Sequence, residues 1–317
     1  MNNTEINVGI DTSLALLDIG ILPSGDFFSF PNDKKGIEKL IKKLISLNPT
    51  RVLIESTGRL ELDFVVAAFE AKLPVVVCNA LRVHRFAESI GQFAKTDKID
   101  AFVIAKYGER NKPRLTRVKP KNLRDISDLI TVRSQLLTSS TMYKNQIKRM
   151  PKIAIAPLNN VLTKIQAEIA KVDKKLDKAI AKVPHWQELV ELLMSAHSVG
   201  RVLAYTLLSE LPELGKLNRK EIATLVGIAP LNKDSGKKNG KRRIRGGRHK
   251  VRTVLYMSMM TAIQHNPKIK AFYQKKIAEG KPKRVALIAC CRKQLVTLNT
   301  MVTVSYTHLT LPTIYSV

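Results

Sequence analysis

The sequence predicts an N-terminal α/β domain over residues 1–112, a helical coiled-coil hairpin over residues 113–184 and a mostly α-helical domain over residues 185–302. Three observations support this division. Short apolar runs typical of strands alternate with amphipathic patterns typical of helices in the first domain. Apolar residues recur with heptad spacing in the second domain, and helical patterns dominate the third.

Strand and helix signals follow one another closely in the first domain. Strands are predicted in the runs 6–11, 14–20, 25–30, 51–57 and 73–79, and helices in the runs 33–48, 62–72, 80–90 and 95–110. Asp33 stands where a helix N-cap is expected. Because helices separate the later strands, we expect those strands to run parallel to one another.

The second domain contains the heptad signal. Residues 121–149 have a polar helical pattern, and Pro151 and Pro157 flank a predicted break. The apolar positions after this break alternate steps of four and three residues, at 158, 162, 165, 169, 172, 176, 179 and 183. This spacing predicts a coiled-coil seam, either within one hairpin or between two subunits.

The third domain begins after Pro184. Helices are predicted over 199–214 and 218–230, then over 251–264 and 284–301. Between the two pairs, residues 233–252 form a basic loop with ten Lys or Arg, four Gly and a single acidic residue, Asp234. Residues 303–317 abandon the helical pattern. We expect them to be non-native or disordered, so their removal should leave folding unchanged.

The positive charge of the chain is confined to its later part. The 317 residues have a net charge of +28, yet residues 1–110 hold 14 basic and 14 acidic side chains. The whole excess therefore lies in residues 111–317. Such an excess favours a polyanionic partner, since lysine and arginine release counterions when they neutralise phosphates.

Membrane and redox roles find little support in the composition. No apolar run approaches the roughly 20 residues of a membrane-spanning helix, and the start of the chain has no signal-peptide pattern. Cys78, Cys290 and Cys291 do not have the spacing of a metal or redox motif. We therefore expect a cytoplasmic protein without a membrane partner.

Four carboxylates stand out by their positions. Asp11 lies in an apolar strand without a basic neighbour in sequence, and Glu55 ends the buried run "VLIE". Asp97 and Asp100 are three residues apart, on one face of a predicted helix. Carboxylates crowded at the edge of a sheet repel each other unless a cation lies between them, and Mg²⁺ prefers such oxygen ligands.

A structural explanation of these residues stays open on composition alone. Asp97 and Asp100 alternate with Lys95 and Lys98, as on a solvated helix face. Glu55 could cap the following helix. Asp11 is the hardest to explain in this way, because an unpaired buried carboxylate is costly.

Four motifs, in order, resemble the DEDD transposases of insertion sequences, of the IS110 type. They are "VGIDTS", "VLIESTG", "VCNALRVHRFAESIGQFAKTDKIDAFVIAKYG" and "LVGIAPLNKDSGKKNGKRRIRGGRHKVRTVLYMS". The resemblance implies an RNase H-like (RuvC-like) first domain in which Asp11, Glu55, Asp97 and Asp100 are catalytic and bind Mg²⁺, with Mn²⁺ as a substitute. It also implies a transposase domain with a helix–hairpin–helix element, although the turn here reads "HSVGRVLAY" in place of the usual proline–glycine turn.

The same resemblance implies that Ser235 is a nucleophile that becomes covalently joined to DNA. Taken alone, a serine before a glycine is an ordinary residue of a flexible loop. The predicted nucleic-acid-binding residues either flank the acidic site or surround this serine: Arg82, Arg85, Lys95, Lys233, Lys237, Lys238, Lys241, Arg242, Arg243, Arg245, Arg248, Lys250 and Arg252.

These features predict a DNA transposase or recombinase that cleaves and exchanges strands with Mg²⁺ through a serine–DNA intermediate. The resemblance implies a structured non-coding RNA as guide, so that base pairing selects donor and target DNA. Since two duplexes must be cut, we expect a homodimer or homotetramer, located with the nucleoid of a prokaryote. Two alternatives remain: a RuvC-like nuclease that uses water, and a non-catalytic RNA-binding scaffold.

Overall fold

The computed structural model describes residues 5–232, 234–236, 240 and 242–310, of which 306–310 are described by their backbone alone. It divides into two compact units, Met1–Lys119 and Pro120–Val317. Lys233, Lys237, Lys238 and Lys241, all predicted to bind nucleic acid, lie outside the described residues.

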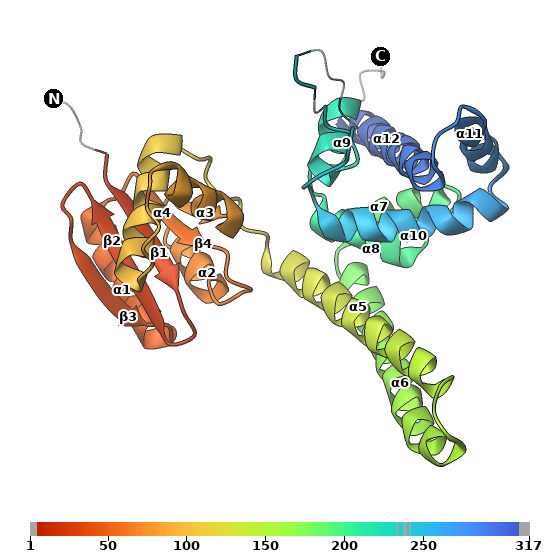
Figure 1. Cartoon of the computed structure of the whole chain (residues 1–317), viewed down its shortest axis with the longest axis horizontal. Helices are drawn as coiled ribbons and strands as arrows, with labels where there is room; N and C mark the ends of the chain where they lie inside the picture. The colour runs from red at the N-terminus through yellow and green to blue at the C-terminus, as the bar shows by residue number, and fades with distance from the viewer. Residues whose placement is uncertain (1–4, 233, 237–239, 241, 311–317) are drawn as a thin grey trace, which may run out of the picture. The chain divides into compact units, whose positions relative to one another are not determined.

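The first unit contains a five-stranded mixed sheet (Figure 1). Its strands are β1 Asn7–Thr12, β2 Leu16–Leu22, β3 Phe27–Pro31, β4 Arg51–Glu55 and β5 Val75–Cys78, in the order β3-β2-β1-β4-β5. The first three strands pair antiparallel, whereas β4 is parallel to both β1 and β5. The predicted α/β domain with parallel later strands is thus confirmed.

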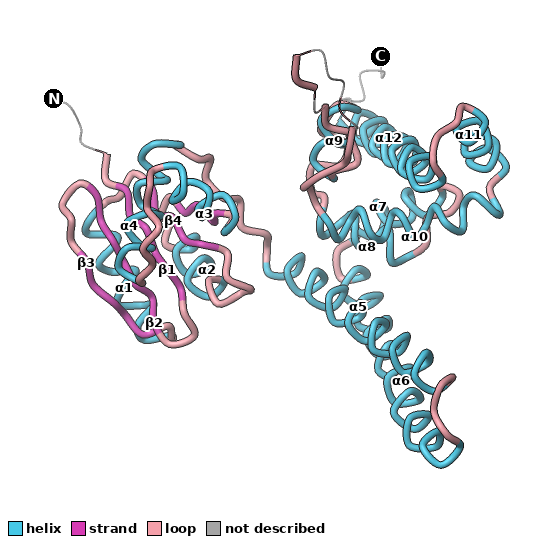
Figure 2. Tube along the Cα trace, in the orientation of Figure 1, coloured by secondary structure: helices cyan, strands magenta, loops and turns pink. Residues whose placement is uncertain are grey.

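Helices cover both faces of this sheet (Figure 2). They are α1 Lys34–Leu47, α2 Leu62–Glu70, α3 Ala80–Ser89 and α4 Asp97–Asn111. The helices α1 and α2 form one core with Val8 and Ile10 of β1, and α3 and α4 form another with Leu53 of β4. Because alternate residues of a strand face opposite sides, Gly9 and Asp11 face the side of α4.

Two glycines bring α4 into backbone contact with the sheet. A Cβ atom on Gly9 would lie 2.1 Å from the carbonyl oxygen of Ala101 and 2.4 Å from the nitrogen of Ala105. On β2, a Cβ atom on Gly20 would lie 3.1 Å from Phe102. Only glycine fits under α4 at Gly9, so this residue fixes how closely the helix approaches β1.

The second unit is α-helical and has a single large core. Its helices are α5 Lys121–Ile147, α6 Lys152–Ala181, α7 Pro184–Ser195, α8 Arg201–Glu210, α9 Arg219–Val226, α10 His249–His265, α11 Pro267–Ala278 and α12 Lys283–Thr310. The predicted helices are present, and α7 and α11 are additional ones. The core joins the base of the α5–α6 hairpin to α7–α12.

The helices α5 and α6 form a long antiparallel hairpin (Figure 1). The predicted break before residue 158 is wrong, because α6 begins at Lys152 and Pro157 lies inside it. Pro157 leaves only the carbonyl of Ile153, near the helix start, without its usual partner. The heptad positions are the sheltered face of α6: Val172 and Leu176 are buried, and the more distal positions are half-buried.

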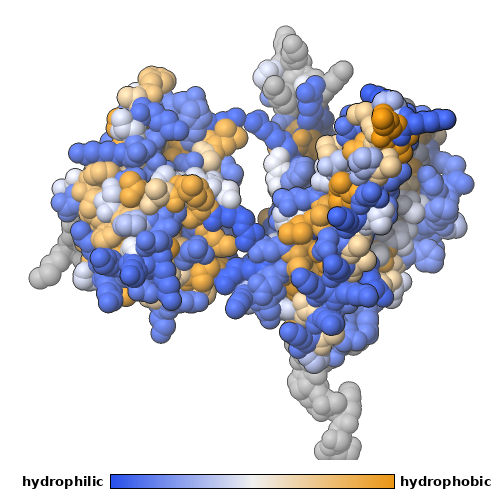
Figure 3. Space-filling model, turned by 90° about the horizontal axis from the view of Figure 1, so that it is seen from below, coloured by the Kyte–Doolittle hydropathy of each residue, from blue (hydrophilic) through white to orange (hydrophobic). Residues whose placement is uncertain are grey.

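Part of the hairpin surface is apolar. Val132 and Leu137 of α5 are 44% and 41% exposed, and Ile153 of α6 is 89% exposed. The second unit also shows an apolar band between hydrophilic areas in the space-filling view (Figure 3). Exposed apolar bands of this kind are typical of surfaces that bind another protein.

The helix α12 differs from its prediction at its C-terminal end. It continues to Thr310, past the predicted boundary at residue 302, and Val302 is buried. The Thr303 hydroxyl donates a hydrogen bond of 2.9 Å to the carbonyl of Gly215. The stretch Lys283–Ser305 is long and apolar enough to span a membrane, but half of it is buried in the protein, as expected of a core helix.

Candidate active site and basic loop

Asp11 and Glu55 lie side by side at the carboxyl ends of β1 and β4. These strands are parallel, with Ile10 opposite Ile54, so Asp11 and Glu55 occupy the next position on each. Both side chains face the side of the sheet that α4 covers, because each lies two residues beyond a residue that contacts α4: Gly9 in β1 and Leu53 in β4. Neighbouring strands are about 4.8 Å apart, which brings the two carboxylates close together.

The first turn of α4 adds Asp97 and Asp100 to the same end of the sheet. Thr96 caps the helix by accepting a hydrogen bond of 3.2 Å from the nitrogen of Ile99. Asp100 precedes Ala101, the residue in contact with Gly9. The partial positive charge at the helix N-terminus stabilises two carboxylates in this turn, which is a structural reason for their presence.

The electrostatics of the cluster are unfavourable to ionised carboxylates. Burial raises the pKa of Asp11, the hydrogen bond from the nitrogen of Thr12 (2.9 Å) lowers it, and the charges of Asp100, Asp97 and Asp18 raise it again. Burial and the charge of Asp11 likewise raise the pKa of Glu55, against the effect of Lys95. These carboxylates therefore repel one another.

The pKa of Asp100 follows the same pattern. Burial raises it, the charge of Lys95 lowers it, and that of Asp97 raises it. Among the described residues, Asp11, Glu55, Asp97 and Asp100 form no ion pair. The cluster therefore lacks a side chain that fully neutralises it.

The donor set suits a hard cation, but the side chains do not enclose one. In the described part of the chain, no group of three or more His, Cys, Asp or Glu side chains is arranged so that it could hold a metal ion. Magnesium commonly binds one or two carboxylates and takes its remaining ligands from water and substrate phosphates. The arrangement of Asp11 beside Glu55 fits that mode.

One acidic residue near this site was not predicted from the sequence. Asp18 of β2 lies directly opposite Asp11 of β1 in the antiparallel ladder and is buried. The hydroxyl of Ser29 donates a short hydrogen bond to its carboxylate. The alternation of β2 alone could have indicated that Asp18 faces inward, but not that it lies opposite Asp11.

The three basic residues predicted beside the acidic site are exposed. Arg82 and Arg85 belong to α3, and Lys95 precedes α4. Lys95 is close enough to Glu55 and Asp100 to lower the pKa of both carboxyls. It thus lies at the edge of the carboxylate cluster in the first unit.

Ser235 lies in the basic loop of the second unit and is exposed. The two limbs of the loop are bridged by a hydrogen bond of 3.0 Å from the nitrogen of Leu231 to the carbonyl of Arg243. Nearer to Ser235, the Asp234 carboxylate accepts a hydrogen bond of 3.2 Å from the nitrogen of Gly240. These contacts hold the serine on a closed loop.

The base of this loop is anchored to α9 by glycine contacts. A Cβ atom on Gly247 would lie 2.3 Å from the nitrogen of Gly227, and Gly227, with φ +78°, ends α9. The Arg252 guanidinium donates to the carbonyls of Val226 (3.3 Å) and Gly246. The glycines at the base of the basic loop therefore allow it to pack closely against the end of α9.

Some predicted nucleic-acid-binding residues form bonds inside the domain. The Arg248 guanidinium pairs with both carboxylate oxygens of Glu213, at 2.5 and 2.6 Å. The Lys250 ammonium donates to Thr131 (2.9 Å) and Glu210 (3.3 Å). By contrast, Arg242, Arg243 and Arg245 are exposed, and within the described residues their side chains form no hydrogen bond or ion pair.

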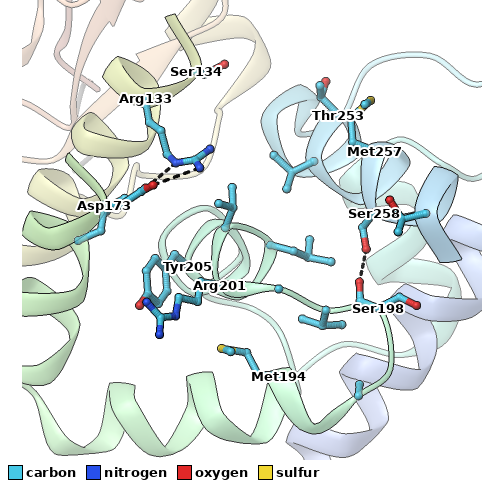
Figure 4. A pocket seen from close by; sticks show the side chains of 18 of the residues that line it. Arg133, Ser134, Asp173, Met194, Ser198, Arg201, Tyr205, Thr253, Met257 and Ser258 are labelled. Carbon is cyan, nitrogen blue, oxygen red and sulfur yellow. Dashed lines mark hydrogen bonds and ion pairs between the residues drawn. The ribbon is translucent and has the colours of Figure 1, made fainter. Parts of the chain in front are cut away.

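A separate pocket of about 950 Å³ lies beneath the turn between α7 and α8 (Figure 4). This turn contains the predicted hairpin, with Ser198 at φ +72°. The Ser258 hydroxyl donates a short hydrogen bond to the carbonyl of Ser198, and Arg133 pairs with Asp173 at 2.6 Å. Because the arginines drawn here are paired with aspartates, the pocket has little free positive charge.

Arg201 and Tyr205 complete the polar side of this pocket (Figure 4). Asp177 accepts hydrogen bonds of 3.0 Å from Arg201 and 2.6 Å from the hydroxyl of Tyr205. Burial and this bond raise the pKa of Tyr205 well above its usual range, so the tyrosine does not act as an acid or base near neutral pH. The polar groups therefore fix the α6–α8 contact.

The sequence of the chain is similar to those of known proteins. The chain matches two family models described as "Transposase" (residues 8–152) and "Transposase IS116/IS110/IS902 family" (residues 190–274). It is 22% identical over 298 residues to the pilin gene-inverting protein of Moraxella bovis, covering 91% of this chain and 92% of that protein.

A second relative matches over a shorter region. The chain is 25% identical over 154 residues to the insertion element IS900 uncharacterized 42 kDa protein of Mycobacterium paratuberculosis, covering 47% of this chain and 37% of that protein. The two family models together cover most of the chain, including the carboxylate cluster and the Ser235 loop. The chain therefore belongs to the IS110-type family of insertion-sequence transposases, enzymes that recombine DNA.

Proposed function

We propose that this transposase cleaves and exchanges DNA strands with Mg²⁺ at the Asp11 cluster and through a covalent bond to Ser235. The observation that carries the proposal is the convergence of Asp11, Glu55 and the first turn of α4 at one end of the sheet. The mixed β3-β2-β1-β4-β5 sheet supports an RNase H-like assignment of the first unit.

Asp11 and Glu55 would hold the metal, with Asp97 and Asp100 contributing as the substrate enters. Bound Mg²⁺ supplies charge stabilisation to a phosphodiester and can be replaced by Mn²⁺ in that role. The mutual repulsion of the carboxylates supports this assignment, since a cation relieves it.

Ser235 would act as the nucleophile in the second unit. Its Oγ forms a bond to phosphorus while the bond from phosphorus to one sugar oxygen breaks, and the hydroxyl proton passes to that leaving oxygen. A sugar hydroxyl of the other strand then forms a bond to this phosphorus while the bond from phosphorus to Oγ breaks, and the sugar hydroxyl proton passes to Oγ. The exposed position of Ser235 supports access to a phosphate, as do the neighbouring Arg242 and Arg243, which pair with none of the described residues.

Target choice by a structured non-coding RNA and action as a homodimer or homotetramer are further parts of the proposal. The second unit has the basic excess that a folded RNA and two duplexes require. The exposed apolar side chains of the hairpin, including Val132 and Leu137, support pairing between subunits. A DNA substrate places the enzyme with the nucleoid of a prokaryote.

Hydrolysis by water at the same carboxylates is the second candidate function. Hydrolysis needs Asp11 and Glu55 but not Ser235, because water replaces the serine hydroxyl as the nucleophile. A non-catalytic RNA-binding scaffold is disfavoured by membership of a transposase family.

A strand-cleavage assay on nicked and junction DNA with Mg²⁺, resolved on denaturing gels, separates these functions. We expect Asp11→Asn to abolish cleavage, with Asp63→Asn as a control because Asp63 is exposed on α2. Ser235→Ala should also abolish strand exchange, whereas Ser46→Ala on α1 should not. Normal cleavage by Ser235→Ala would establish hydrolysis, and normal cleavage by Asp11→Asn would overturn the metal assignment.

A further inference from the structure

A pocket of about 880 Å³ lies beside the Ser235 loop and takes no part in the chemistry described above. The loop after α9 contributes Ile228 and Pro230, and the returning limb of the basic loop contributes Arg242, Arg243 and Ile244. The rest of its wall comes from α10 and α12. The pocket therefore lies entirely within the second unit.

Among the described residues, four arginines and no acidic residue line this pocket. They are Arg242, Arg243, Arg284 and Arg292. Within the described residues, none of the four guanidinium groups forms an ion pair or side-chain hydrogen bond. In this unit Arg133, Arg201 and Arg248 each pair with a carboxylate, whereas the charge of the four pocket arginines is uncompensated among the described residues and favours an anionic occupant.

The floor of the pocket is apolar and contains an aromatic ring. Tyr256 of α10 and Ile288 of α12 pack against the buried core, so the floor is firmly supported. Val285 extends the floor to the surface, where it is 51% exposed. An apolar floor with an aromatic ring suits a nucleobase, and arginines at the rim suit its phosphates.

The position of the pocket ties it to the proposed nucleophile. Arg243 is one partner of the bridge that closes the basic loop, and Pro230 precedes the other partner, Leu231. Ser235 is five residues from Pro230, so the chain places it at most roughly 18 Å away. A strand whose phosphate lies at Ser235 could thus place a nearby nucleotide in the pocket.

We propose that this pocket binds one unstacked nucleotide of the DNA strand that is exchanged, with its base on the Tyr256 floor and its phosphate among the arginines. The inference rests on the proposed function for its substrate, but binding needs neither Ser235 nor a metal. Holding a base out of the duplex would favour strand separation next to the cleaved phosphate.

The test measures binding of the full chain carrying Ser235→Ala, in EDTA, to a duplex with one extrahelical thymidine and to the same duplex with an abasic residue there. We expect the base to strengthen binding by about tenfold, as base stacking on aromatic side chains does elsewhere. An RNA version of the probe distinguishes a DNA nucleotide from an RNA one, and equal or tighter RNA binding would overturn the assignment to DNA.

Variants connect this preference to the pocket. Arg284→Gln/Arg292→Gln and, separately, Val285→Glu should reduce the base preference to less than twofold. Lys281→Gln/Lys283→Gln removes the same charge outside the pocket and should preserve the preference. Equal binding of both probes by the parent chain, or a full preference in both pocket variants, would overturn the proposal; loss of cleavage alone would not.

Discussion

Replacing Gly9 by alanine tests how the fold positions the carboxylates. A Cβ atom there would lie 2.1 Å from the carbonyl oxygen of Ala101, where ordinary contact begins at 3.4 Å. The helix α4 must therefore move by roughly 1.3 Å, which carries Asp97 and Asp100 away from Asp11. Such overpacking costs about 1–3 kcal/mol of folding free energy.

The expected loss of activity exceeds the loss of stability. A displacement of about 1 Å in an active site can lower the rate about 100-fold. Gly36→Ala is the matched control, because its Cβ would lie 2.0 Å from the carbonyl oxygen of Pro31, at the start of α1 and away from the site. The assay combines thermal unfolding with strand cleavage per folded molecule.

The two variants should destabilise the protein similarly, but only Gly9→Ala should lose most of its cleavage. Cleavage by Gly9→Ala at the rate of Gly36→Ala, both corrected for folded fraction, would refute the reasoning. It would show that the contact between α4 and β1 does not set the geometry of the carboxylates.

Three further outcomes follow from the structure. Asp11→Asn should raise the melting temperature at pH 7. The pKa of Asp11 is raised in the folded state, so the carboxyl stabilises the fold below its ordinary pKa, and this stabilisation is lost as the pH rises. The gain in melting temperature should therefore vanish in acid, and a gain independent of pH would contradict this. Arg248→Ala should lower the free energy of unfolding by about 1.5–3 kcal/mol, because it removes the ion pair with Glu213. Arg243→Ala should leave stability unchanged but weaken DNA binding. Denaturant titration measures the first effect and fluorescence anisotropy the second, and equal losses of stability in both variants would contradict the different roles of the two arginines. Truncation after Val302 should lower the free energy of unfolding by about 1 kcal/mol, because it removes the hydrogen bond from Thr303 to Gly215. An unchanged melting temperature would contradict this and agree with the expectation from the sequence.

Much of the fold could be predicted because its elements have strong local patterns. The alternation around Val8 and Ile10 and the N-cap at Asp33 follow from residues close in sequence, and the structure confirms both. Pro157 and Thr303 show where local rules fail. A proline near a helix start costs little, and packing of α12 extends that helix past its apolar pattern.

The candidate site was predictable in part for a similar reason. Asp11 was recognisable as an acid in an apolar strand, but its neighbour Asp18 depends on the register of β1 with β2. The roles of Arg248 and Arg243 could not be separated by sequence, since both are arginines of the basic loop. Only the structure shows that Arg248 pairs with Glu213 and that Arg243 lines a pocket to which the described residues contribute no carboxylate.

Peptide mapping of a trapped protein–DNA adduct tests most directly that the Asp11 cluster and Ser235 act in one reaction. The full chain is incubated with nicked DNA and Mg²⁺, denatured, digested and analysed by mass spectrometry. We predict a nucleotide on the peptide containing Ser235 in the parent chain, and none in Asp11→Asn although that variant still binds DNA. An adduct on another residue, or an undiminished Ser235 adduct in Asp11→Asn, would contradict the account.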